Sequence, residues 1–288
     1  MYVTMKEILD DANKNYYGVI SASVINLELV RGAIRAAQEE NAPIIINIGQ
    51  GQMTKHGDCQ IISKIVRTLA GRATIPVALN LDHGKDYERI THAFRHQFSS
   101  IMIDASAYSL EENIQRTREV VKLCHSQNVT VEGEIGFIGQ AADSDDEKFD
   151  LYTRVEDAVL FFKETDVDAL AIAVGTAHGK YPANREPKID FDRIKEIKQA
   201  TNKPLVLHGG SDSGSENIRQ AVACGINKIN VCTDTFVSCK EGLKTMLQET
   251  PDIDFMAMMM EMENTAKKTI QDYIRISGST GKANNFRQ

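Results

Sequence analysis

The stretch VALNLDHG, residues 77–84, begins as an apolar run and ends with Asp82, His83 and Gly84. The apolar run predicts a buried strand of a parallel sheet, because a strand that is covered on both faces is apolar along its length. The polar end has two interpretations. Either Asp82 or His83 caps a helix that follows the strand, or both side chains belong to an active site at the tip of the strand.

Segments of the same kind recur along the 288 residues, and an amphipathic stretch follows each of them. The eight apolar segments cover residues 17–24, 42–48, 75–82, 99–104, 128–135, 167–174, 203–208 and 226–231. Amphipathic stretches include residues 26–40, 61–69, 110–127, 154–165 and 216–224. Eight strands that alternate with helices favour an α/β fold of the (β/α)8 type, a TIM barrel, as a single domain over residues 1–288.

Three segments lie outside this repeat. Residues 4–15 predict a helix before the first strand, and residues 235–247 and 255–275 predict helices after the eighth. The methionine-rich part of the last helix, residues 255–262, is expected to be buried. An open, doubly wound sheet is the alternative fold, and the lack of a GxGxxG motif after the first strand disfavours it.

Composition restricts the class of protein. The formal net charge is −7, which argues against nucleic acid or an anionic membrane as the main partner. The five cysteines are odd in number and form no CxxC pair, which indicates reduced thiols. No apolar stretch approaches the ~20 residues of a membrane span, and the first residues lack the pattern of a signal peptide. These features predict a cytoplasmic protein.

Histidines collect at the ends of the predicted strands. His83, His178 and His208 lie at or just after the third, sixth and seventh strands, whereas the other four histidines lie in or beside helical segments. The C-terminal ends of TIM-barrel strands meet on one face, where the chemistry of such enzymes takes place. Three imidazoles with an open position suit a divalent transition metal, and zinc first. Taken singly, each histidine has a plainer interpretation as a cap or a core side chain.

Carboxylates lie at the same strand ends. Side chains of a strand alternate between its faces, so Glu132 and Glu134 share one face, and Glu134 is expected to act as a movable fourth ligand. Asp104 ends the fourth strand and has three interpretations. It orients a metal ligand, it lies beside a second cation, or it caps the following helix.

Small and neutral residues after the last three strands indicate an anion site. Gly179 and Gly209 follow the sixth and seventh strands, and glycines there let backbone amides approach an anion. Ser211, Asn230 and Thr233 add neutral hydrogen-bond donors. Because the loops after strands seven and eight of TIM barrels often hold a phosphate, these five residues predict a phosphate site.

Five motifs in this order carry a family resemblance: NLDHG at 80–84, VEGEIG at 131–136, AVGTAHGKY at 173–181, LHGGS at 207–211 and KINVCTD at 228–234. Over residues 17–235 the chain resembles the class II, zinc-dependent ketose-bisphosphate aldolases, which include the fructose- and tagatose-bisphosphate enzymes. The resemblance implies a TIM barrel that forms a homodimer or homotetramer. It also implies reversible cleavage of a ketose (bis)phosphate into dihydroxyacetone phosphate and an aldehyde.

The resemblance further implies a role for each predicted site residue. His83, His178 and His208 would bind Zn²⁺, with Glu134 as an alternative ligand and Asp82 as the catalytic acid or base. The phosphate of a dihydroxyacetone-phosphate unit would lie in a cradle, with a monovalent cation nearby; the cradle residues would be Gly179, Gly209, Ser211, Asn230 and Thr233. The chemistry agrees, since a zinc ion stabilises the enediolate of aldol cleavage as a Lewis acid. Asp82 lies beside a ligand, where it can take up a proton.

A class I aldolase would instead need a lysine at a strand tip to form a Schiff base. Lys228 is the one candidate, and we expect it to be a charge at the start of a strand that reaches solvent.

The chain departs from the family pattern where the distal half of the substrate is recognised. Ser21-Ala22-Ser23 replaces Ala-Phe-Asn on the first strand, Asn80 replaces a common histidine, and Asp212 replaces a glycine after HGGS. The place of the glutamate that protonates the enediolate is Ala142, with Asp143 beside it. The acidic stretch 143–150 predicts a lid. The segment PDIDFMAMMMEM, residues 251–262, lacks the arginine of an Asp-Pro-Arg segment.

These departures predict an aldolase whose aldehyde product differs from glyceraldehyde 3-phosphate. Two alternatives stay open. The chain is a non-catalytic relative that acts as a binding or assembly subunit, which Ala142 and Asp212 would explain. Or it is a zinc-dependent lyase or epimerase of sugar phosphates that shares the enediolate step.

Overall fold

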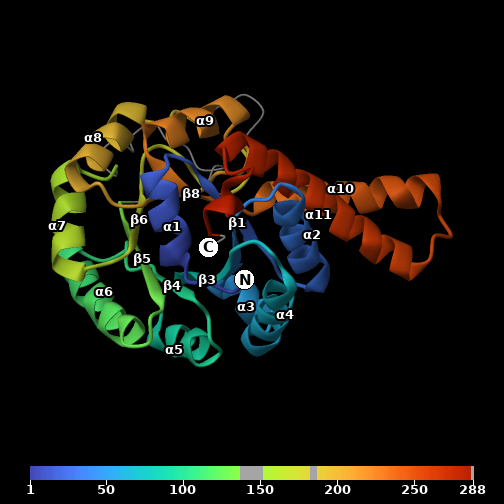
Figure 1. The fold of residues 1–288 in the computed structure, drawn as a ribbon, viewed down its shortest axis with the longest axis horizontal. Coiled ribbons are helices and arrows are strands. Elements are labelled where there is room, and N and C mark those ends of the chain that lie inside the picture. Colours follow the sequence, from blue (N-terminus) through green and yellow to red (C-terminus); the bar gives the residue numbers. More distant parts are fainter. Residues whose placement is uncertain (137–151, 182–186, 287–288) are drawn as a thin grey trace.

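The computed structural model describes residues 1–136, 152–181 and 187–286. Eight parallel strands form a closed barrel in the order of the sequence (Figure 1). The strands are β1 (Val19–Ser23), β2 (Ile44–Gly49), β3 (Val77–Gly84), β4 (Ser100–Ile103), β5 (Thr130–Ile135), β6 (Ala169–Ile172), β7 (Leu205–Leu207) and β8 (Ile226–Val231). The ladder closes where β1 pairs with β8, Ser21 opposite Asn230. The predicted TIM barrel is therefore confirmed, and the open sheet is wrong.

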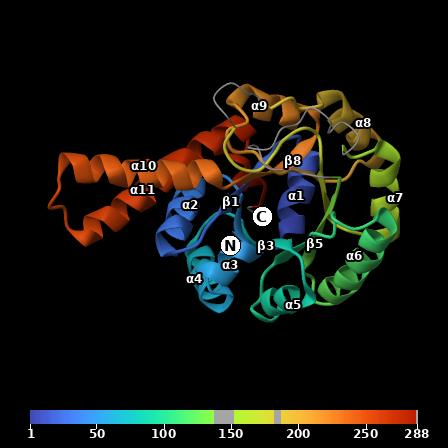
Figure 2. The same cartoon turned by 180° about the vertical axis from the view of Figure 1, so that it is seen from behind.

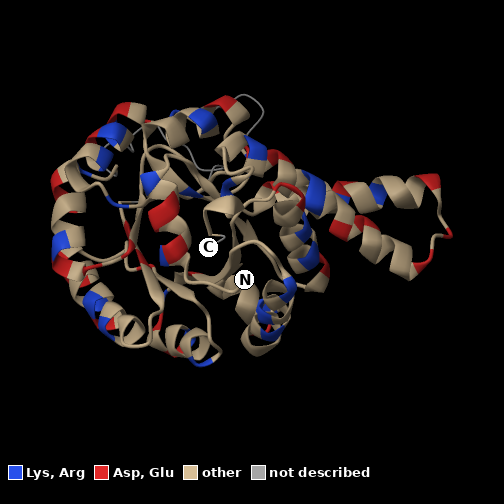
Figure 3. Ribbon diagram, viewed as in Figure 1, with Lys and Arg blue, Asp and Glu red and all other residues tan. Residues whose placement is uncertain are grey.

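Helices surround the barrel on its outer side (Figure 2). They are α2 (Leu27–Glu39), α3 (Gln50–Lys55), α4 (Cys59–Arg72), α5 (Tyr87–Arg95), α6 (Leu110–His125), α7 (Val155–Thr165), α8 (Phe191–Thr201) and α9 (Ser215–Cys224). Side-chain caps explain several starts, since Asn26, Asp58, Asp86 and Ser109 each accept a hydrogen bond from a backbone N–H of the first turn. Basic and acidic residues are mixed along these outer helices (Figure 3).

Helix α1 (Met5–Lys14) covers the end of the barrel at which the strands begin. Thr4 and Glu7 form a capping box at its start. Its apolar face, with Met5, Ile8 and Leu9, is buried in one cluster with Val19, Ile45, Ala78, Met102 and Val206. This end of the barrel is therefore filled with apolar side chains, and the polar residues lie at the opposite end. No helix of the described residues has the length and apolar composition needed to cross a membrane.

Helices α10 (Thr233–Glu249) and α11 (Phe255–Ser277) form a hairpin that extends away from the barrel, followed by the short helix η2 (Lys282–Phe286) (Figures 1 and 2). From Glu263 onward, α11 packs along α2. Buried Glu263 there pairs with Arg31 at 2.9 Å and with Arg35 at 2.5 Å. A Cβ on Gly32 would lie 2.8 Å from the Glu263 carbonyl, so only glycine allows this close approach.

The expectation that residues 255–262 are buried is wrong, because each of them is partly or largely exposed. Phe255, Met256 and Met260 are 73%, 71% and 58% exposed. They lie near the tip of the hairpin, beyond the part of α11 that packs against the barrel helices. The helix predicted over residues 255–275 is present. How far it projects beyond the barrel depends on tertiary packing, which the local pattern of apolar residues does not determine.

Candidate metal centre at the barrel mouth

The C-terminal ends of the strands surround a cavity of about 250 Å³. Eight of the residues predicted from the sequence line it: Asp82, His83, His178, Gly179, Gly209, Ser211, Asn230 and Thr233. Ser23, Gln52 and Cys232 complete the lining. The structure therefore brings together residues that are up to 210 positions apart in the sequence, from Ser23 to Thr233.

An irregular strand end explains why neighbouring Asp82 and His83 reach the same cavity. Successive side chains of a regular strand point to opposite faces. His83 has φ of 48°, in the left-handed region, and the register between β3 and β4 shifts between Leu81 and Gly84. This bulge interrupts the alternation, so both side chains line the cavity. The simple helix cap is wrong here, because Asp86 caps α5.

The three histidines form a compact group. Ring centroids are 5.1 Å apart for His83 and His178, 4.8 Å for His83 and His208, and 5.8 Å for His178 and His208. One nitrogen of each ring lies within 4.8 Å of the others. His83 Nε2 and His208 Nδ1 are 3.1 Å apart, close to the roughly 3.3 Å that separates two nitrogens on one tetrahedral zinc ion. The group therefore fits a metal ion of this type.

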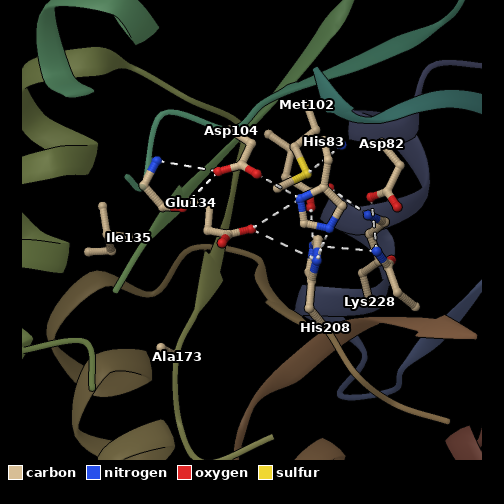
Figure 4. A network of polar contacts seen from close by, with 12 residues as sticks. Asp82, His83, Met102, Asp104, Glu134, Ile135, Ala173, His208 and Lys228 are labelled. Atoms are coloured by element: carbon tan, nitrogen blue, oxygen red, sulfur yellow. Dashed lines mark hydrogen bonds and ion pairs between the residues drawn. The ribbon is translucent and has the colours of Figure 1, made fainter. Parts of the chain in front are cut away.

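Carboxylates orient two of these rings (Figure 4). His83 Nδ1 lies 2.9 Å from Asp104 Oδ2, and His208 Nε2 lies 3.1 Å from Glu132 Oε1. An ionised carboxylate only accepts hydrogen bonds, so these ring nitrogens carry the hydrogens. The other nitrogens, His83 Nε2 and His208 Nδ1, face each other. This is the usual arrangement for metal-binding histidines, in which a carboxylate fixes the ring that it contacts.

The charges of the site shift the pKa values of its groups in opposite directions. Burial lowers the pKa of His83, but Asp82, Asp104 and Glu134 outweigh it and raise the pKa to about 9. Burial and the nearby His83 lower the pKa of His178 to about 4 and that of His208 well below its usual value. Burial alone would raise the pKa of Asp82, yet His83, His208 and Lys228 hold it below its usual value. Asp82 is therefore a carboxylate at neutral pH.

Glu134 is buried beside the histidines and has unused bonding capacity. Its Oε2 lies 3.8 Å from His83 Nδ1 and 3.9 Å from His208 Nδ1, and it has no hydrogen-bond partner among the described residues. Burial and the charge of Asp104 raise the pKa of Glu134 to about 8. A buried oxygen without a partner is costly unless an ion or ligand satisfies it, which fits the expected role of a movable ligand.

Asp104 contacts His83, and its second oxygen accepts a hydrogen bond from the Ser106 hydroxyl at 2.7 Å. Burial opposes ionisation of Asp104, but the bond to His83 outweighs it and lowers the pKa of the acid. Ser109, not Asp104, caps helix α6, so the cap interpretation is wrong. Asp104 also belongs to a second group that could hold a cation, with His83 and Glu134.

The other side of the cavity consists of backbone turns and the start of α10. Gly179 and Gly209 have φ of 101° and 64°. Thr233 is the first residue of α10, and Ser211 Oγ accepts hydrogen bonds from the backbone N–H groups of Cys232 and Asp234. The start of a helix carries a partial positive charge, which attracts anions. The predicted phosphate residues are therefore grouped at a suitable place.

Gly209 is expected to tolerate no side chain. A Cβ there would lie 2.3 Å from the Ala177 carbonyl oxygen, whereas a Cβ on Gly278, also at positive φ, would have no atom within 4 Å. We expect Gly209→Ala to lower the free energy of unfolding by about 1–3 kcal/mol more than Gly278→Ala, because of the added clash. Chemical denaturation of both variants checks this. Equal losses would mean that the clash is relieved by a small backbone shift.

Two of the unusual residues are not part of the cavity lining. Asp212 has φ of 58°, where glycine is favoured, and its carboxylate accepts a hydrogen bond from the backbone N–H of Tyr181 at 2.9 Å. It therefore ties the loop after β6 to the loop after β7. Asn80 is buried inside the barrel, where it donates to Asn47 Oδ1 at 2.8 Å.

Sequence reasoning missed Gln52 and misjudged Lys228. Gln52 Nε2 contacts Cys232 Sγ at 3.3 Å across the cavity, and its position just after a strand end was the available signal. Lys228 does not reach solvent, because it is fully buried against Glu132. Ala142, Asp143 and the stretch 143–150, predicted to contain a lid, lie outside the described residues.

Comparisons with known proteins show the family to which the chain belongs. The family described as fructose-bisphosphate aldolase class-II matches residues 3–282. A sulfofructosephosphate aldolase of Alkalicoccus urumqiensis is 37% identical over 99% of both chains, and a fructose-bisphosphate aldolase of Geobacillus stearothermophilus is 34% identical over 98% of both. The crystal structure of the YdjI aldolase from Escherichia coli K12 superposes with a TM-score of 0.86 at 32% identity, covering 98% of this chain and 100% of that one. The chain therefore belongs to the class II fructose-bisphosphate aldolase family.

Proposed function

We propose that this protein is a zinc-dependent aldolase that reversibly cleaves a ketose phosphate into dihydroxyacetone phosphate and an aldehyde. The observation that carries the proposal is the convergence of three histidines at a cavity that His83, His178 and an ionised acid, Asp82, line and behind which His208 is buried. His83, His178 and His208 would hold the zinc ion, and Glu134 is an alternative ligand. A bound zinc ion would supply Lewis-acid stabilisation of the negative charge that develops at the ketone end.

Asp82 is proposed as the base in cleavage. Its Oδ1 accepts a hydrogen bond from Asn230 Nδ2 at 3.1 Å, which fixes the carboxylate at the edge of the cavity. In cleavage it takes the proton from the hydroxyl on the carbon that becomes the aldehyde. The carbon–carbon bond then breaks, and its electron pair passes to the other half as an enediolate, which gives dihydroxyacetone phosphate on taking up one proton at carbon. In the reverse direction Asp82 returns the proton as an acid.

The substrate phosphate is proposed to bind over the ends of β6, β7 and β8. Gly179 and Gly209 let backbone amides approach it, and hydroxyl groups of Ser211 and Thr233 and the side chain of Asn230 add donors. A monovalent cation near this phosphate remains part of the proposal, because it would offset the negative charge that the phosphate brings to the site.

The aldehyde product is proposed to differ from glyceraldehyde 3-phosphate. Residues 250–254, between α10 and α11, lie at the tip of the projecting hairpin, and the segment 251–262 contains no arginine. Ser23 replaces the asparagine of the family pattern in the cavity lining. The relatives include both a sulfofructosephosphate aldolase and fructose-bisphosphate aldolases, so the distal group varies among proteins of this similarity.

A panel of ketose phosphates tests the substrate. We expect kcat/KM for a ketose 1-phosphate with another distal group, sulfofructose 1-phosphate among them, to exceed those for fructose and tagatose 1,6-bisphosphate by at least about tenfold, which corresponds to loss of one charged contact. Product analysis identifies dihydroxyacetone phosphate and separates cleavage from epimerisation. Selective and efficient cleavage of either bisphosphate would overturn the proposal that the aldehyde product differs from glyceraldehyde 3-phosphate. It would leave the aldolase assignment intact.

Two residues, Asp212 and Ala142, suggested a non-catalytic protein, and Asp212 no longer supports that alternative. Asp212 contacts a neighbouring loop and is not part of the cavity lining, so it does not exclude a phosphate from the site. The second support, Ala142, lies outside the described residues.

A further inference from the structure

Lys228 and Glu132 form an ion pair inside the barrel, below the histidines. Both side chains are fully buried, and Lys228 Nζ lies 2.6 Å from Glu132 Oε2 (Figure 4 shows Lys228 beside His208). They come from β8 and β5, which are not neighbours in the sheet, so the pair spans the barrel interior. Lys228 is thus engaged by a carboxylate and does not line the cavity, which argues against a Schiff-base role for this residue.

The second oxygen of Glu132 contacts a proposed zinc ligand. Glu132 Oε1 lies 3.1 Å from His208 Nε2, and this carboxylate accepts the hydrogen of that nitrogen. Asn230 Nδ2 is 3.4 Å from the same nitrogen but donates instead to Asp82 Oδ1 at 3.1 Å. His208 is therefore the tautomer with hydrogen on Nε2. Its Nδ1 keeps a lone pair toward His83 Nε2, where the ion would bind.

A buried ion pair adds little to the free energy of unfolding, because the cost of removing two charges from water is about as large as the gain from their attraction. We propose that Lys228 and Glu132 are positioning residues that hold His208 in its metal-binding tautomer; this inference rests on the proposed function. Lys228 occupies Oε2 and thereby directs Oε1 at His208. Together the two residues decide which ring nitrogen of His208 is available to the metal.

Glu132→Gln separates this role from a structural one. The side chain of Gln has one oxygen and one NH2 group, and Lys228 can only donate, so the amide oxygen turns to Lys228. The NH2 group then faces His208 Nε2 and favours hydrogen on Nδ1, the nitrogen that the metal needs. We expect the zinc dissociation constant to rise about 10–100-fold, the range for loss of such a partner of a metal ligand.

The double variant Lys228→Met with Glu132→Gln should reverse much of this loss. Without Lys228 the amide rotates and presents its oxygen to His208 Nε2, which restores the tautomer. We expect the double variant to bind zinc at least about fivefold more tightly than Glu132→Gln, against the usual expectation that a second change adds to the first. Removing both charges also avoids a lone buried charge, so the double variant should fold.

Two measurements test the proposal, both independent of cleavage: zinc affinity by competition with a chelator, and the His208 tautomer in metal-free protein by nitrogen-15 NMR. Glu263→Gln, which changes a buried glutamate that pairs with arginines of α2 and does not line the cavity, is the matched control and should bind zinc as the unaltered protein does. Equal affinities for Glu132→Gln and the unaltered protein, or a double variant no better than Glu132→Gln, would overturn the positioning role. Failure of the unaltered protein to bind zinc would instead overturn the proposed function.

Discussion

Asp82→Asn is expected to reduce kcat for cleavage by about 10²–10⁴-fold, the range for loss of a general base, while zinc content stays unchanged. The amide has nearly the same shape as the carboxylate and its oxygen can still accept the hydrogen bond from Asn230, so the cavity is preserved. What is lost is the ability to take up the hydroxyl proton. Steady-state cleavage assays on the best substrate of the panel, with metal analysis of the same samples, check this.

Asp272→Asn is a suitable control, because that side chain is 69% exposed on α11 and does not line the cavity. It should leave kcat unchanged. If Asp82→Asn kept more than about a tenth of kcat, another group would be the base, and the assignment of Asp82 would be withdrawn.

His83→Ala is expected to abolish zinc binding and to lower kcat/KM by at least about 10³-fold, because several kcal/mol of charge stabilisation are lost with the ion. His83 offers one nitrogen to the proposed ion, and Asp104 holds its ring in place. Removal of His83 therefore removes one metal ligand and leaves Asp104 with no ring to orient. Metal content after extensive dialysis and activity with added zinc are the measurements. A chelator should inactivate the unaltered protein, and zinc should restore it.

His92→Ala provides the comparison, since His92 lies on α5, where its ring contacts His96 and not the cavity. It should retain both zinc and activity. Normal zinc content in His83→Ala would show that the three-histidine assignment is incorrect.

The repeat of apolar segments was enough to predict the fold. Each predicted strand end lies within two residues of the observed one, because a strand buried on both faces needs a continuous apolar run. The histidines could be selected by the same argument, since a barrel brings the ends of its strands to one face. His83, His178 and His208 do lie together, with their ligand nitrogens within 4.8 Å.

The chain's local pattern did not reveal the contacts that cross the barrel. Lys228 appeared to be a solvent-exposed charge, yet it meets Glu132, 96 residues away, inside the barrel. The sequence placed the negative charge of Asp212 next to the predicted phosphate site, yet its left-handed backbone directs the carboxylate to the Tyr181 amide. In both residues the partner comes from another strand or loop, and no spacing within a single segment predicts it.

The sequence by itself determined the barrel, the strand ends and the kinds of group that stand there, because these follow from periodicity and from the fixed geometry of a closed parallel sheet. Only the tertiary structure decided which nitrogen of His83 and of His208 is available and which carboxylate holds each ring. It also decided that Asp82 and His83, neighbours in VALNLDHG, share one cavity. The reason is that a bulge at His83 and contacts from Asp104 and Glu132 set the directions of these side chains, and directions depend on neighbours brought close by folding.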